Sequence, residues 1–210
     1  MGKAELNKKI KRDNLLDSAF RLFIENGFHK TSISDIVKKA GVAKGTFYLY
    51  FTDKFDLRDK LISHKGAQIL SKAYQALLQQ SGLGFEEQII FFTDHILNQF
   101  NEDKNLVSFL SKHLSWAYLK SFLKDAPLAE DVKVEEIFNK LIFASGNQYR
   151  NPEILIYMII EFVSGASYSS ILYQQPVPIE ELKPYIFDTI RSILRQERLP
   201  ETEETKDERQ

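Results

Sequence analysis

The sequence predicts an all-α protein in which a three-helix head is joined by a long helix to a larger helical bundle. Apolar residues recur every three or four positions along most of the 210 residues, which is the period of an amphipathic helix. No run of useful length alternates apolar and polar residues as a half-buried strand does. Gly27, Gly41 and Gly82 interrupt the apolar stripes, and glycine commonly follows the last turn of a helix. We therefore expect about nine helices.

The expected helices follow one another along the chain. The first runs from about Lys8 to Asn26, and two short helices follow between Thr31 and Phe51. A long helix begins near Asp53 and ends near Gln80. Asn151 and Pro152 open a later helix as its cap and its first residue, positions that these residue types favour. The remaining helices are expected at about 85–101, 104–124, 127–148, 151–173 and 179–196.

One expected helix, from Ile154 to Tyr173, is apolar enough to suggest a membrane span. Glu161 lies near its middle, and a carboxylate at the centre of a bilayer is costly, so a buried helix is the better interpretation. The N-terminus is polar and lacks the apolar segment of a secretory signal. The chain also has no cysteine, so disulfides are excluded. We expect a cytoplasmic protein.

The formal charge is distributed unevenly between the two parts of the chain. Residues 1–65, the head, hold 14 Lys+Arg and 8 Asp+Glu, a net charge of +6. Residues 66–210, the body, hold 14 and 21, a net charge of −7. This asymmetry favours a nucleic-acid partner for the head alone. Lys8, Lys9, Lys11 and Arg12 form a basic arm that is either a solvated, flexible start or a DNA contact.

Residues 31–54 have the pattern of a helix-turn-helix. Ser32 can cap the first short helix, with Asp35 three residues later as the acid of a capping box. Gly41 ends that helix, and the second one begins near Lys44. Phe47, Tyr50 and Phe51 place large rings at helical spacing, so part of that face packs inward. The alternative is an ordinary helical hairpin in which these rings are only core.

The residue types in this segment suit contact with DNA. Thr31 and Ser32 lie at a helix start, whose N–H groups favour phosphate. Lys44 and Thr46 can reach base edges, and Gly45 lets the backbone approach the groove. The Tyr48 hydroxyl and the Lys54 ammonium can each contact a phosphate. Phosphate contacts position a protein on DNA, and base contacts specify the sequence.

The run from Gly41 to Phe51, followed by Lys54 and Leu57, resembles the DNA-binding domain of the tetracycline-repressor (TetR) family. The resemblance covers about the first 60 residues and includes Ala19, Phe20, Phe23, Gly27, Thr31, Ser32, Ile36 and Ala40. It implies an all-helical homodimeric regulator, most often a repressor that a small ligand releases from DNA. It assigns phosphate contacts to Thr31, Ser32, Tyr48, Tyr50 and Lys54, and base contacts to Lys44, Gly45 and Thr46. Tyr50 and Ala43 depart from the family pattern, in which histidine and a hydroxyl residue are frequent.

The expected function is that of a ligand-responsive transcriptional regulator, most simply a repressor, which binds a palindromic operator as a homodimer and is released by a small molecule. The alternative is a helical protein-interaction module that does not bind DNA. The expected domains are residues 1–52 for DNA binding, 53–197 for effector binding and dimerisation, and 198–210 as a disordered acidic tail. We expect no catalytic residue, metal site or cofactor, because the sequence has no phosphate loop, nucleophile elbow or metal-ligand spacing.

The middle of the chain is the expected effector site. Residues 66–175 hold 16 of the 26 aromatic residues, and an aromatic-rich bundle with a few polar groups suits a small-molecule pocket. The alternative is that these rings are only core. The candidate ligand-binding residues are Phe92, His95, His113, Trp116, Asn147, Glu161 and Tyr168.

The last two long helices are the expected dimer interface. Small residues in the helix at 151–173 would let a partner helix approach closely, and the last helix has one apolar stripe. Spacing alone favours an intramolecular core, whereas the resemblance favours a four-helix interface between two copies. The candidate interface residues are Gly165, Ser169, Leu182, Ile186, Ile190 and Ile193.

Overall fold

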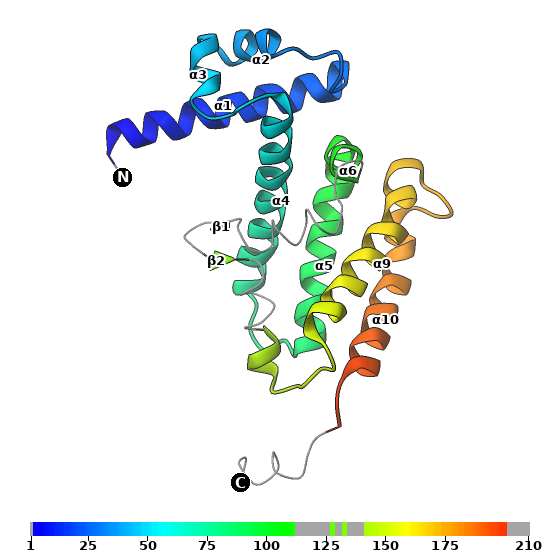
Figure 1. Cartoon of the computed structure of the whole chain (residues 1–210). Helices are drawn as coiled ribbons and strands as arrows, with labels where there is room; N and C mark the ends of the chain where they lie inside the picture. Colours follow the sequence, from blue (N-terminus) through cyan, green and yellow to red (C-terminus); the bar gives the residue numbers. More distant parts are fainter. Residues whose placement is uncertain (1, 112–126, 129–131, 134–140, 201–210) are drawn as a thin grey trace. The chain divides into compact units, whose positions relative to one another are not determined.

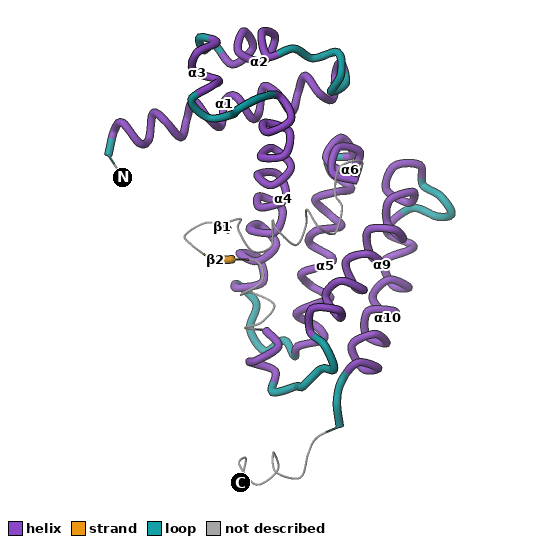
Figure 2. Tube along the Cα trace, viewed as in Figure 1, coloured by secondary structure: helices purple, strands orange, loops and turns teal. Residues whose placement is uncertain are grey.

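The computed structural model describes residues 2–111, 127–128, 132–133 and 141–200 (Figure 1). It divides into two compact units, Met1–Lys65 and Gly66–Gln210, which coincide with the basic head and the acidic body. The expectation of an all-α protein is confirmed: Figure 2 shows helices joined by loops in both units. The boundary between the units falls within a helix, eleven residues after its first residue, whereas the sequence placed the domain boundary at that helix start.

The head contains three helices and the beginning of a fourth. They are α1 (Lys3–Asn26), α2 (Ile33–Ala40), α3 (Lys44–Tyr48) and α4 (Lys54–Leu78). α1 begins five residues before the expected start, so the basic arm is the exposed first part of a helix. The basic side chains from Lys8 to Arg12 are solvent-exposed, and their contact with DNA remains a prediction.

Local hydrogen bonds explain where the short helices begin and end. Ser32 and Asp35 form the expected capping box, since the Ser32 hydroxyl accepts from the Asp35 N–H and the Asp35 carboxylate accepts from the Ser32 N–H. Gly41 ends α2 with φ of 67°, a left-handed conformation that favours glycine. Asp53 caps α4 by accepting from the N–H groups of Phe55 and Asp56. These caps fix the turn between α2 and α3 and the start of α4.

Apolar side chains from all four helices form the core of the head. Phe47 of α3 and Phe51 after it are fully buried, which matches the expectation that this face packs inward. Full burial of an aromatic side chain contributes roughly 1.5–3 kcal/mol, so these two rings hold the short α3 in place. The other buried residues are Leu15, Leu16, Ala19, Leu22, Phe23, Ile36, Val37, Leu57, Leu61 and Ile62.

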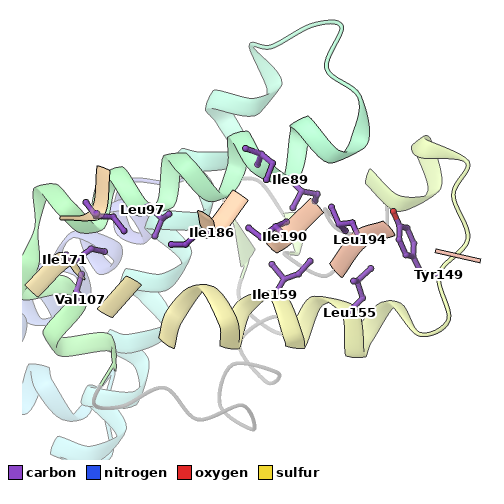
Figure 3. Packing of buried hydrophobic residues seen from close by; sticks show 12 residues of the cluster. Ile89, Leu97, Val107, Tyr149, Leu155, Ile159, Ile171, Ile186, Ile190 and Leu194 are labelled. Carbon is purple, nitrogen blue, oxygen red and sulfur yellow. The ribbon is translucent and has the colours of Figure 1, made fainter. Parts of the chain in front are cut away.

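The body is built around three long helices that pack together (Figure 1). They are α5 (Phe85–Glu102), α9 (Pro152–Tyr173) and α10 (Ile179–Glu197), and α6 (Lys104–Ser111) packs on α9. Asn151 caps α9 through the Ile154 N–H with Pro152 as first residue, as the sequence predicts. The core between these helices is apolar; Figure 3 shows Leu155 and Ile159 of α9 facing Ile190 and Leu194 of α10.

One expected helix is corrected. The segment 127–148 contains two short strands, β1 (Pro127–Leu128) and β2 (Val132–Lys133), which pair antiparallel, and only residues 141–145 of its described part are helical. Val132 is β-branched, which favours a strand over a helix interior. The C-terminal part of the helix expected at 104–124 and the tail beyond residue 200 lie outside the described residues.

Ion pairs reinforce the contact between α5 and α10. Arg195 pairs with Glu86 at 2.9 Å, and Arg191 pairs with Glu87 at 3.2 Å. Lys183 is buried and pairs with Asp94 of α5 at 3.0 Å, and it also donates to the Asn98 side chain. A buried ammonium is stable only with such partners, so Lys183 belongs to the body's internal structure.

Candidate nucleic-acid interface

The exposed face of α3 is the feature of the head that best suits a ligand from solution. Lys44 and Gly45 are exposed at its start, and Tyr48 and Leu49 are 53% and 74% exposed at its end. These positions are three or four residues apart, so they lie on one side of the helix, opposite the buried Phe47. The face therefore combines a cation, a bare stretch of backbone, a phenol and an apolar side chain.

Nothing in the structure of the head requires a glycine at position 45. A Cβ atom built at this position would meet nothing within 4 Å, and the backbone does not have the positive φ that favours glycine. Glycine within a helix is less favourable than alanine by about 1 kcal/mol. The absence of a side chain therefore serves something outside the head, which agrees with the expectation that a ligand approaches the backbone here.

Thr46 and Tyr50 border this exposed face, and both are only partly exposed. The Tyr50 carbonyl oxygen accepts a hydrogen bond from the Lys60 ammonium at 3.1 Å, and its ring packs beside Phe51. Ala43, the residue before α3, makes no side-chain cap. Contacts of Thr46 and Tyr50 with DNA remain predictions.

The start of α2 already holds a negative charge. The Ser32 hydroxyl donates to the Asp35 carboxylate at 2.6 Å, and the hydrogen bonds from the Ser32 side chain and backbone hold the pKa of Asp35 below its usual value of 3.8. Asp35 is therefore ionised at neutral pH and offsets the positive end of the helix dipole. Ser32 is exposed, and its phosphate contact remains a prediction that has to compete with this carboxylate.

The phosphate contact predicted for Thr31 is not supported, because its side chain is buried. The side chain is 2% exposed, and its hydroxyl faces the carbonyl oxygens of Gly27 at 2.9 Å and Leu22 at 3.2 Å. A hydroxyl with these partners closes the turn after α1. Its place at a helix start suggested a phosphate contact, but the turn rotates its side chain into the head.

The phosphate contact predicted for Lys54 is not supported either, because its ammonium group is engaged within the head. Its ammonium donates to the carbonyl oxygens of Phe28 at 2.9 Å, Thr31 at 2.8 Å and His29 at 3.4 Å. It also lies 4.5 Å from the centroid of the Phe28 ring. An ammonium has three N–H donors, and these three acceptors engage them all. Lys54 thus ties the start of α4 to the turn after α1, and this position does not support the predicted phosphate contact.

Comparisons with known proteins agree with this assignment of the head. The family model for bacterial regulatory proteins of the tetR family matches residues 15–61, which include α2, α3 and the buried residues around them. The chain is 35% identical over 74 residues to the fatty acid metabolism regulator protein of Bacillus subtilis (strain 168), a match that covers 35% of this chain and 38% of that protein. The head of the chain is therefore similar to tetR-family regulators.

The tetR fold extends beyond the head. A putative TetR-family transcriptional regulator from Syntrophomonas wolfei superposes with a TM-score of 0.66 at 22% identity, over 88% of this chain and 95% of the other. FadR from Bacillus subtilis, solved in complex with stearoyl-CoA, superposes with a TM-score of 0.59 at 19% identity, over 84% and 96%. By sequence, the matched stretches span 35–50% of the lengths of the first curated relatives. At these identities the structures establish the fold of the tetR body and not its ligand.

The structure places the predicted ligand residues of this chain in different packing clusters of the body. Phe92 is buried in a cluster with Ala73 and Leu77, whereas Tyr168 packs against the core between α5, α9 and α10. The His95 ring stacks on the ring of Phe91. Asn147 forms a side-chain hydrogen bond with Tyr149, which lowers the pKa of Tyr149, but burial has the larger effect and raises that pKa. Residues His113 and Trp116 lie outside the described residues. The described members are assigned to more than one cluster, and a shared ligand site remains a prediction.

The pocket-lining role expected for Glu161 is not supported by its position. It was expected as a carboxylate that lines a pocket inside an apolar helix, but it is exposed on α9. The side of α9 that carries it, here called the outer face, also holds the exposed Ile154, Tyr157, Gly165, Ser169 and Tyr173. α9 is long and apolar enough to cross a membrane by length and composition. Only 28% of that window is buried inside the body, so the expected buried helix is found only in part, and Glu161 lies on its exposed side.

The predicted dimer residues fall into two classes. Ile186 and Ile190 of α10 are buried in the body's own core, so their assignment to an interface is wrong, and the alternative of an intramolecular core is correct for them (Figure 3). Leu182 and Ile193 are partly buried against the same core. Gly165 and Ser169 are exposed on the outer face of α9. The apolar stripe of α10 faces inward because α5 and α9 cover it.

Proposed function

We propose that this chain is a ligand-responsive transcriptional regulator, most simply a repressor, which binds a palindromic operator as a homodimer in the cytoplasm. The exposed face of α3 carries the proposal, because Lys44, Gly45 and Tyr48 present groups that DNA can use and that the head does not use itself. The family match over residues 15–61 and the net charge of +6 support the same partner.

The outer face of α9 supports the homodimer. It exposes a continuous row of side chains with Gly165 at its centre, and a Cβ atom there would meet nothing within 4 Å. Glycine in the middle of a 22-residue helix lowers its stability, so close approach by a second helix is the reason that remains. A two-fold pair also places two heads on half-sites about one helical turn of DNA apart.

The effector acts in this proposal by its difference in affinity between two states of the dimer. α4 contributes residues to both the head and the body, so it is the segment through which we propose that ligand binding reaches the head. Stearoyl-CoA, which the related FadR structure contains, is the first probe for the ligand. Release of bound DNA by stearoyl-CoA would assign a long acyl group to the effector. Unchanged DNA binding would exclude that probe and leave the DNA-binding proposal intact.

The decisive experiment measures binding of the full chain to duplex DNA as salt is varied. Phosphate neutralisation requires the logarithm of the binding constant to fall linearly with the logarithm of the salt concentration. Lys44→Ala should weaken binding roughly tenfold, or about 1.4 kcal/mol, without altering the thermal unfolding of the head. Tyr48→Phe tests the hydroxyl alone and should have a smaller effect. Salt-independent binding, or parental affinity in both variants, would favour the protein-interaction module.

The names of the curated relatives favour a binding protein over an enzyme. Among the residues that the structure describes, no group of three His, Cys, Asp or Glu side chains could hold a metal ion. The curated relatives are named as transcriptional regulators. The proposal therefore assigns the exposed groups of α3 to binding and not to a reaction.

A further inference from the structure

Leu49 is the most exposed large apolar side chain among the described residues of the head, at 74%. Its backbone has φ of −75° and ψ of −19°, so it continues the spiral of α3 by one residue. This places Leu49 four residues after Gly45 and directly after the exposed Tyr48. The buried Phe47 and Phe51 lie on the other side of the same turn.

Two features of this face do not stabilise the isolated head. A leucine left in water forfeits the free energy of burial, and a glycine in a helix is less favourable than an alanine. The head requires neither feature, because a Cβ atom at Gly45 would meet open space and Leu49 points away from the core. The two positions are neighbours on one side of α3, so one external partner explains both.

The surroundings identify the chemistry of that partner. Lys44 is exposed on the same face, and Lys30 and Lys38 are exposed elsewhere on a head of net charge +6, which suits a polyanion. A groove that also accepts an apolar side chain must offer an apolar group. In the major groove of DNA, the C5-methyl of thymine is that group, and no other base presents one.

We infer that Leu49 is a specificity-determining residue that packs on the C5-methyl of a thymine while Gly45 lets the backbone of α3 approach the same groove. The inference rests on the proposed function and adds to it a base preference. It assigns one thymine in each half-site to Leu49. It also assigns the reading of that base to an apolar contact and not to a hydrogen bond.

The test begins with selection of a tight-binding duplex from a random DNA library by the full chain. Each thymine of that duplex is then replaced by deoxyuridine, which removes only the methyl group, and affinities are measured by fluorescence anisotropy. The parent should lose about fourfold at one thymine per half-site, the factor expected for one buried methyl-sized group. Leu49→Ala should bind the thymine duplex more weakly and should be indifferent to that replacement. Leu78→Ala, which truncates an exposed leucine of the body, should behave as the parent does.

The outcomes separate the two proposals. If the parent binds the thymine and deoxyuridine duplexes equally at every position, the inference about Leu49 is overturned and DNA binding stands. The same follows if Leu49→Ala keeps the full loss at the same thymine. If the parent selects no duplex from the library, the proposed function fails and the inference fails with it.

Discussion

The head and the body each expose a glycine within a helix, and a comparison of the two shows how a partner can be inferred from an unexplained residue. Gly45 of α3 and Gly165 of α9 both have open space where a Cβ atom would lie. Gly45 has Lys44 and Tyr48 beside it in a unit of net charge +6, whereas Gly165 shares its face with Glu161 and Ser169 in a unit of net charge −7. The same absence of a side chain thus points to DNA in one unit and to another copy of the chain in the other.

The largest expected effect comes from a substitution at Gly165, which tests the predicted dimer interface of the body. Gly165→Leu places a bulky group where we expect a partner helix, so the dimer should dissociate to a species near 24.4 kDa at micromolar concentration. DNA affinity should fall by roughly a hundredfold or more, because a single head loses the second half-site. Sedimentation velocity and duplex binding measure the two effects.

The matched control is Asn101→Leu, which adds a similar side chain at an exposed position of α5. It should leave the mass and the DNA affinity unchanged. Both variants should remain folded, since a Cβ atom at position 165 meets nothing within 4 Å in the folded body. A dimeric Gly165→Leu variant would show that the outer face of α9 is not the interface.

The next effect tests whether Lys54 acts inside the head or on DNA. Lys54→Met keeps the length of the side chain but leaves the carbonyl oxygens of Phe28 and Thr31 without their charged donor. We expect a loss of about 2–3 kcal/mol in the free energy of unfolding, measured with urea. Lys30→Met is the control, because Lys30 is exposed and its replacement should change the free energy of unfolding by about 0.5 kcal/mol or less. Unchanged stability with a shallower salt dependence of DNA binding would restore Lys54 as a phosphate contact.

A smaller effect sharpens the comparison between the two glycines. Gly45→Ala should stabilise α3 by up to about 1 kcal/mol, because alanine is the better helix former and its Cβ meets open space. The same methyl group should weaken DNA binding roughly tenfold, or about 1.4 kcal/mol, by keeping the backbone from the groove. Gly165→Ala should give a similar gain in helix stability and no direct change at the DNA. Stronger DNA binding by Gly45→Ala would remove the reason for the glycine.

The smallest expected effect concerns the pH dependence of the head alone. Burial lowers the pKa of His64 below its usual 6.5, with Asp13 and Asp17 opposing this shift and Lys65 and Arg12 adding to it. The folded head therefore binds this proton less tightly than the unfolded chain, so stability is fully present above pH 6.5 and declines as the pH falls below it. Urea unfolding at about pH 7.5 and about pH 5.5 should show a smaller difference in His64→Gln than in the parent. An equal difference in both would assign the decline to other groups.

Local signals allowed much of the head to be predicted. Ser32 and Asp35 cap α2, Gly41 ends it and Phe47 is buried, and each follows from residue type and spacing within one or two turns. The roles of Thr31 and Lys54 could not be predicted in this way. Their partners lie four to twenty-six residues away in the turn after α1, and the sequence alone does not say which carbonyl oxygens that turn presents.

In the body, periodicity showed which residues of α10 are apolar but not what covers them. Ile186 and Ile190 are equally suited to a partner helix and to their own core, and the packing of α5 and α9 against α10 decided for the core. For Gly165 the interface role stays a prediction, which the open space within 4 Å of a Cβ atom there supports.

The sequence by itself determined the helical class, the caps of the short helices, the charge of the two units and the resemblance to the tetR family, because these depend on residue identity and near-neighbour spacing. Only the tertiary structure decided which polar groups face inward and which apolar groups face outward. Burial depends on contacts between segments far apart in the chain, so the internal hydrogen bonds of Lys54 and the exposure of Leu49 became clear only once the helices were packed.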